Sequence, residues 1–235
     1  MNSPNLTSTL PTVLPAAKNY RDWFLPFDYD QISLRQGLAS LATLGAPQEE
    51  IPLIVRLMEN PEGLGLLPGS VDLHQHDCIH LILGRGLLPK DEAFIIGFTM
   101  GSTKRMSSWE EKVFTWVSQH FYPDIYRFSP EDLEIFKDAV HLAQISHCKA
   151  FDEINFDQFL DYSLKDIREF LGLESNLIRT YYQLEKSRYP NAKESQRLLT
   201  REAQGILPVL ILILILALIA FSIIFGKITL SSPPK

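Results

Sequence analysis

The chain is 235 residues long and 46% hydrophobic, which suits one domain of ordinary size plus an appendage and excludes a disordered polymer. Its 22 basic and 28 acidic residues give a formal net charge of −6, and no Lys/Arg run interleaves with aromatic residues, so nucleic acid is not an expected partner. The two cysteines, Cys78 and Cys148, form no CxxC pair, so we expect neither a disulfide framework nor a thiolate zinc site. This cysteine usage favours a reducing compartment.

The N-terminal third begins with a leader and continues with helical patterns. Residues 1–25 lack the charged start and apolar run of a signal peptide, so we expect a flexible leader there. Leucines recur every three or four positions between residues 30 and 45, which predicts a helix. Residues 51–58 repeat apolar positions at i, i+3, i+4 and i+7 before an Asn-Pro-Glu-Gly stretch, which predicts a second one.

The residues best suited to chemistry lie in the window VDLHQHDCIHLILGRGLLPKDEAFIIGFTMGS. On a helix, His76 and His80 share one face, with about 5 to 6 Å between Cβ atoms, as two ligands of one metal require. Asp77 adjoins His76 and precedes His80 by three positions, so it lines the same groove. We expect it either to bind the metal directly or to orient a histidine.

A carboxylate returns to this groove from the next helix. The eleven residues between His80 and Glu92 contain two glycines and Pro89, which predict a turn and a second helix beginning near Pro89. Glu92 then falls in the first turn of an antiparallel neighbour, opposite the histidines. Such ligands suit zinc best, with iron, manganese or magnesium as alternatives, and disfavour calcium. The predicted metal ligands are His76, Asp77, His80 and Glu92.

Other residues of the chemically active types carry weaker signals. Cys78 lies about 200° around the helix from both metal-binding histidines, so we expect it to pack in the core. Arg85 lies in a Gly-Arg-Gly turn, and its planar guanidinium could bind an anionic substrate through two hydrogen bonds. The alternative hypothesis is that Arg85 is an exposed arginine without such a role. A zincin protease is disfavoured because Asp77 occupies the place of that motif's glutamate. Surface or core roles are expected for His74, His120, His141 and His147.

Four more helices are predicted after the window, at residues 107–121, 129–147, 163–172 and 177–188. Ser129 followed by Pro130 and two acids is the clearest helix start, while Ser163 and Gly172 mark the ends of the next helix. Alternating β-branched runs are absent from the sequence. We therefore expect an all-α domain over residues 26–188, followed by a juxtamembrane linker over residues 189–205.

A membrane span is predicted at residues 206–225, ILPVLILILILALIAFSIIF, which carry no charge and extend about 30 Å as a helix. Basic residues are more frequent just before this stretch than after it, so the positive-inside rule places the domain on the cytoplasmic side. The expected protein is a single-pass, tail-anchored one.

The motif HDCIH, followed by LILGRGLLPKD and Glu92, resembles the pattern of the ubiquinone (coenzyme Q) biosynthesis protein 4 family, which is His-Asp-x-x-His, eleven residues, then Glu. Upstream, RLMENPEG is similar to that family's Asp-Pro-x-Gly region. Downstream, SLKDIREFLGL is similar to its Val-Arg-x-x-Leu-Gly-Ile segment. The resemblance covers residues 30 to 175 of this chain.

The resemblance implies an all-α fold at a membrane and a divalent metal held at His76, Asp77, His80 and Glu92. It also implies removal of the ring carboxylate, with hydroxylation, from a prenylated 4-hydroxybenzoate-type precursor, and organisation of other quinone-biosynthesis enzymes. Three hypotheses about function follow: a metal-dependent decarboxylase (lyase), a non-catalytic prenyl-lipid-binding scaffold, and an adaptor whose histidines are incidental. The C-terminal span departs from the family, so a bacterial inner membrane and a mitochondrial inner membrane both remain candidates.

Overall fold

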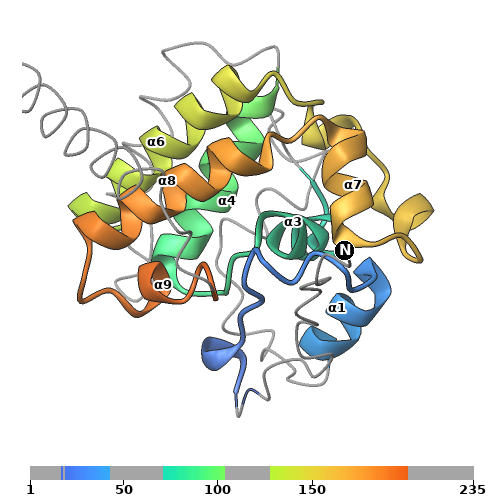
Figure 1. Cartoon of the computed structure of the whole chain (residues 1–235), viewed down its shortest axis with the longest axis horizontal. Helices are drawn as coiled ribbons and strands as arrows, with labels where there is room; N and C mark the ends of the chain where they lie inside the picture. The colour runs from blue at the N-terminus through green and yellow to red at the C-terminus, as the bar shows by residue number, and fades with distance from the viewer. Residues whose placement is uncertain (1–16, 18, 43–70, 104–127, 201–235) are drawn as a thin grey trace, which may run out of the picture. The chain divides into compact units, whose positions relative to one another are not determined.

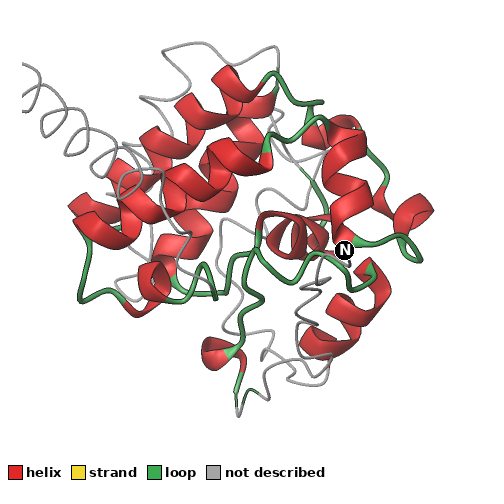
Figure 2. Ribbon diagram, viewed as in Figure 1, coloured by secondary structure: helices red, strands yellow, loops and turns green. Residues whose placement is uncertain are grey.

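A computed structural model describes residues 17, 19–42, 71–103 and 128–200, and every regular element in these ranges is helical (Figures 1 and 2). The helices are α1 (Leu34–Ala42), α3 (Leu73–Leu83), α4 (Pro89–Ser102), α6 (Pro130–Ser146), α7 (Leu164–Leu171), α8 (Ser175–Arg188) and α9 (Lys193–Gln196), with short 3-10 turns η1 (Tyr20–Asp22), η4 (Phe151–Glu153) and η5 (Phe156–Phe159). The all-α prediction is thereby confirmed for the described part.

The chain divides into two compact units, Met1–Thr200 and Arg201–Lys235. The second unit, with the span predicted over 206–225, lies outside the described residues, as do the helices predicted over 51–58 and 107–121. No helix within the described ranges has both the length and the apolar character needed to cross a membrane.

Local sequence signals account for the α3–α4 hairpin. Asp72 caps α3 by accepting a hydrogen bond from the Gln75 amide at 2.8 Å, and Gly84 ends it with φ +68°. A side chain at Gly84 would also approach the Phe27 Cα to 2.6 Å, so glycine is required there for two reasons. Helix α4 then begins with Pro89 at its first turn, as predicted.

Helices α4 and α6 lie side by side (Figure 1), and two glycines of α4 lie against the backbone of α6. A Cβ atom added at Gly97 would overlap the Phe136 carbonyl oxygen, and one at Gly101 would lie 2.5 Å from the Val140 carbonyl oxygen. The spacing Gly-x-x-x-Gly therefore gives α4 a side-chain-free stripe on which the α6 backbone rests. Ser129 caps α6 as predicted, accepting from the Asp132 amide.

Two side chains from late in the sequence satisfy carbonyl groups around the end of α3. The guanidinium of Arg168 on α7 is fully buried and donates to the Ile82 and Phe27 carbonyl oxygens at 2.7 and 2.8 Å. The Tyr182 hydroxyl on α8 donates to the Leu83 carbonyl oxygen. The last carbonyls of a helix have no partner within it, so these donors fix α3 against α7 and α8.

The compact unit is larger at both ends than the sequence predicts. Trp23 and Leu25, expected in the flexible leader, are 2% and 1% exposed, and Leu198 and Leu199, expected in the linker, are also buried. The Phe27 amide donates to the Leu198 carbonyl oxygen at 3.0 Å, which joins the two ends. Each large apolar side chain gains about 1.5–3 kcal/mol on burial, so a few of them are enough to bind a largely polar segment to the core.

Candidate metal centre

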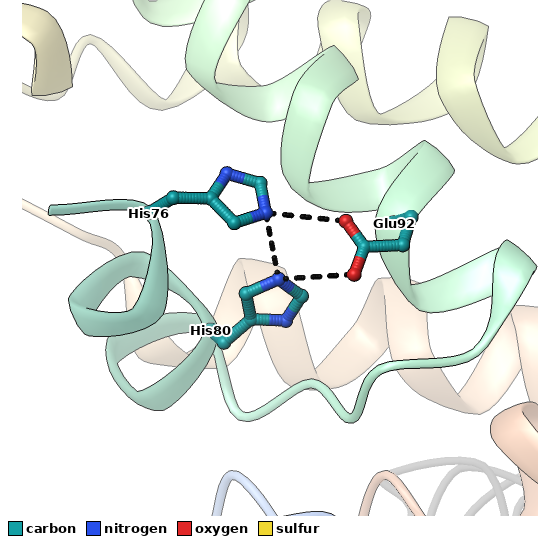
Figure 3. Close-up of side chains that lie close together, drawn as sticks. All are labelled: His76, His80 and Glu92. Atoms are coloured by element: carbon teal, nitrogen blue, oxygen red, sulfur yellow. Dashed lines mark hydrogen bonds and ion pairs between the residues drawn. The ribbon is translucent and has the colours of Figure 1, made fainter. Parts of the chain in front are cut away.

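Three of the four predicted ligands converge on one point between α3 and α4 (Figure 3). The Nε2 atoms of His76 and His80 lie 3.0 Å apart. The Glu92 carboxylate faces both rings, with Oε2 3.1 Å from His76 Nε2 and Oε1 3.4 Å from His80 Nε2. The predicted hairpin geometry, with two histidines on one helix and an acid from the next, is therefore present.

These distances fit a shared metal ion. Zinc binds nitrogen and oxygen ligands at about 2.0–2.1 Å, so two ligand atoms of a tetrahedral ion lie about 3.3 Å apart. The two imidazole nitrogens lie 3.0 Å apart, and each lies 3.1 or 3.4 Å from one of the two oxygens of the Glu92 carboxylate, so all three separations are close to that value. Moreover, two imidazole Nε2 atoms at 3.0 Å repel each other if both present lone pairs or both present hydrogens, so the pair needs a proton or a cation between them.

The site is shielded from water, and its charges are coupled. His76 and His80 are 6% and 0% exposed, while the Glu92 side chain is 17% exposed. Burial is the largest single influence on Glu92 and favours its neutral form, but the two histidines outweigh it and hold the pKa of this carboxyl well below its usual range. For His80, burial opposes protonation, yet Glu92 and Asp77 prevail and raise its pKa. Glu92 is therefore held in its anionic form, the state that binds a metal, whereas the raised pKa of His80 means that a metal ion would have to displace a proton from its ring.

Asp77, the fourth predicted ligand, lies beside this cluster but is not one of the three residues whose ligand atoms converge. Burial raises the pKa of its carboxyl, partly offset by the charges of His80 and His76. Asp77 directly follows His76 on α3 and precedes His80 by three positions. Direct metal binding by Asp77 remains a prediction.

Arg85 lies elsewhere. Its guanidinium is fully buried and forms a bidentate pair with Glu185 on α8, with Nη1–Oε1 3.0 Å and Nη2–Oε2 2.5 Å. It also stacks on the Phe94 ring, 3.8 Å from the centroid. The sequence suggested either a substrate-binding arginine or an exposed one, and neither fits. The Arg85 guanidinium binds Glu185 inside the protein because the Gly-Arg-Gly turn folds inward onto α8.

The remaining histidines and cysteines follow the sequence expectations. His74, His141 and His147 are exposed, and His74 pairs with Asp157 at 2.9 Å, while His120 lies outside the described residues. Cys78 is fully buried in the core.

Sequence reasoning missed the buried polar residues behind the hairpin turn. Asp91 is fully buried and accepts a hydrogen bond from Arg197 at 2.6 Å, although 106 positions separate the two residues. The only local signal was the position of Asp91 in the first turn of a helix, where acids are common.

Comparison with protein-family models, curated proteins and solved structures finds no match to this chain. The candidate centre is therefore defined by its own geometry, as a buried His-His-Glu cluster on an antiparallel helix pair.

Proposed function

We propose that this chain holds a divalent metal ion, zinc in the first place, through His76, His80 and Glu92. The observation that carries the proposal is the convergence of two imidazole nitrogens and one carboxylate, whose ligand atoms all lie within 4.8 Å of one another. Iron, manganese and magnesium are the alternatives. Asp77 completes the proposed set as a further ligand or as a residue that orients the histidines.

With Asp77 as a residue that orients the histidines, the number of protein ligands favours a catalytic role over a structural one. Structural zinc sites have four protein ligands, whereas catalytic sites have three and keep a position for water or substrate. Among the described residues three ligands converge, and Glu92 retains some solvent exposure. Because both histidines are buried, bulk water would have limited access to the open coordination position of the ion.

The substrate class follows from the resemblance of HDCIH, LILGRGLLPKD and Glu92 to the ubiquinone biosynthesis protein 4 family, of which we propose the chain is a member. An ion held by these residues would act as a Lewis acid toward an aryl carboxylate or phenolate. Loss of the carboxylate as CO₂ leaves an electron pair on the ring carbon, which takes a proton. In the hydroxylating reaction dioxygen would take two electrons and leave as hydrogen peroxide, while water supplies the hydroxyl group. The substrate proposed is a prenylated 4-hydroxybenzoate-type ring.

A prenyl tail is driven out of water by about 0.8 kcal/mol per buried CH₂, so such a substrate resides in a membrane. We propose that the uncharged stretch 206–225 anchors the chain there, with the domain on the cytoplasmic side of a bacterial or mitochondrial inner membrane. A scaffold that binds prenyl lipids and gathers other quinone-biosynthesis enzymes is the alternative function.

The experiment combines metal analysis with metabolite profiling of cells that express His76→Ala or Glu92→Gln in place of the natural chain. His74→Ala is the matched control, because this exposed histidine of the same helix lies outside the cluster. We expect the two site variants to lose the metal and to accumulate a ring-carboxylated prenyl precursor at normal protein level. Unchanged metabolites despite loss of metal would favour the scaffold, and a metal-free natural chain would refute the centre.

A further inference from the structure

The segment Lys193–Thr200 is attached to the hairpin turn that joins the two metal-binding helices. The Arg197 Nη2 donates to Asp91 Oδ2 at 2.6 Å, and Asp91 is the residue directly before Glu92. The Asp91 Oδ2 also accepts from the Leu88 amide at 3.2 Å, which caps the first turn of α4. One carboxylate therefore connects the start of α4 to a residue 106 positions later.

Arg197 is held firmly in this position. Its side chain is 8% exposed, and its guanidinium lies 4.9 Å from the centre of the Phe24 ring. A Cβ atom at Gly86 would overlap Arg197 Nη2, so the glycine in the turn makes room for the guanidinium.

A second polar attachment lies next to the first. The Ser195 hydroxyl donates at 2.9 Å to Glu185, which is the partner of Arg85. Arg85 in turn lies 3.9 Å from Asp91 Oδ1. The segment thus contacts the turn both directly, through Arg197, and indirectly, through the buried pair of Arg85 and Glu185.

The placement of Glu92 depends on this attachment. The first turn of a helix is held by fewer hydrogen bonds within the helix than its interior is, because the first amides have no partners there. Glu92 lies in that turn of α4, while both histidines lie on α3, so any displacement of the turn changes the separation between the carboxylate and the imidazoles. Metal sites require ligands held to within about 0.5 Å.

We propose that Arg197 is a positioning residue of the metal centre, which fixes the first turn of α4 through Asp91 and so holds Glu92 opposite His76 and His80. This inference rests on the proposed metal centre. Arg197 itself touches none of the three ligands in the contacts above; it acts through the backbone and cap of α4.

The test uses the purified full chain and the double variant Arg197→Met/Asp91→Asn, which removes the ion pair without leaving a buried charge alone. Asparagine keeps an acceptor for the Leu88 amide. The control is Arg188→Met/Asp138→Asn, which removes a more exposed ion pair of the same 2.6 Å length outside the turn. The measurements are the Zn²⁺ dissociation constant by chelator competition, the visible spectrum with Co²⁺, and the melting temperature of the metal-free chain.

We expect the double variant to bind Zn²⁺ about 10- to 100-fold more weakly, as loss of outer-shell partners does, with an altered Co²⁺ spectrum, while the control binds normally. In a Glu92→Asp background, where a carboxylate shorter by one methylene should leave weaker but measurable binding, the same double change should have little further effect on affinity, because its action passes through the placement of Glu92. Equal weakening in both backgrounds would show a general structural role and overturn the inference, as would unaltered binding. If the natural chain binds no metal, the proposed centre fails, and the inference fails with it.

Discussion

The short distance between α4 and α6 gives the most direct test of the structure, through Gly101→Ala. A Cβ atom there would lie 2.5 Å from the Val140 carbonyl oxygen and 2.8 Å from the Val140 Cα, and both are backbone atoms. Ordinary contact begins at 3.4 Å, so the helices must separate by about 0.9 Å, the difference between 3.4 and 2.5 Å. Overpacking of this kind costs about 1–3 kcal/mol, and replacing a helical glycine by alanine returns about 1 kcal/mol.

Gly37→Ala is the matched control. Its Cβ atom would lie 2.7 Å from Leu81 Cδ2, the end of a flexible side chain that is able to turn away. Both variants receive the same gain in helix propensity, so their difference in the free energy of unfolding isolates the clash with the α6 backbone. We expect Gly101→Ala to be less stable than Gly37→Ala by about 1–3 kcal/mol.

The assay is urea unfolding followed by circular dichroism, with melting temperature as a second measure. In a domain of this size each kcal/mol corresponds to about 2–4 °C. Gly101 lies at the end of α4 opposite Glu92, so metal affinity should fall less than stability does. Equal stability of the two variants would refute the close approach of α4 and α6.

Further predictions concern the buried ion pair, the carbonyl groups near the end of α3, the cysteines and the metal. Arg85→Met should cost about 3–5 kcal/mol in urea unfolding because Glu185 is left buried and unpaired, whereas adding Glu185→Leu should recover much of the loss. Arg168→Met should lower the free energy of unfolding by about 1–3 kcal/mol for each carbonyl left without its donor, and a loss under 1 kcal/mol would contradict its assigned role. A thiol reagent should modify the partly exposed Cys148 in the folded chain but the fully buried Cys78 only on unfolding, as read by mass spectrometry of digested protein. Zinc at 100 times its dissociation constant should raise the free energy of unfolding by about 2.7 kcal/mol, an effect that a chelator reverses and that Glu92→Gln abolishes.

The hairpin that carries His76, His80 and Glu92 was predictable from the sequence because its determinants are local. The spacing of His76 and His80 fixes their common face, and the turn residues before Pro89 fix the return of the chain, so that Glu92 falls opposite them. The cap at Ser129 was found for the same reason, since a capping residue acts within one helical turn.

The long-range contacts were not predictable in this way. Trp23 and Leu198 lie in segments that are locally polar or irregular, and only the folded core shows that each is buried. The partner of Arg85 was equally hard to predict, because a guanidinium can bind the carboxylate of a substrate or that of an internal glutamate in the same geometry. Arg168 gave no signal either, since the acceptors of its hydrogen bonds are backbone carbonyls, which every residue has.

The dependence of α3 on Arg168 and Tyr182 has a consequence for how the protein is made. These donors follow their acceptors Ile82 and Leu83 by 86 and 99 positions. At about 5–20 residues per second, the ribosome produces both histidines and Glu92 roughly 5 to 20 s before the residues that complete α3. We therefore expect nascent chains to capture zinc poorly until Tyr182 has emerged, so that loading of the ion follows synthesis of the domain.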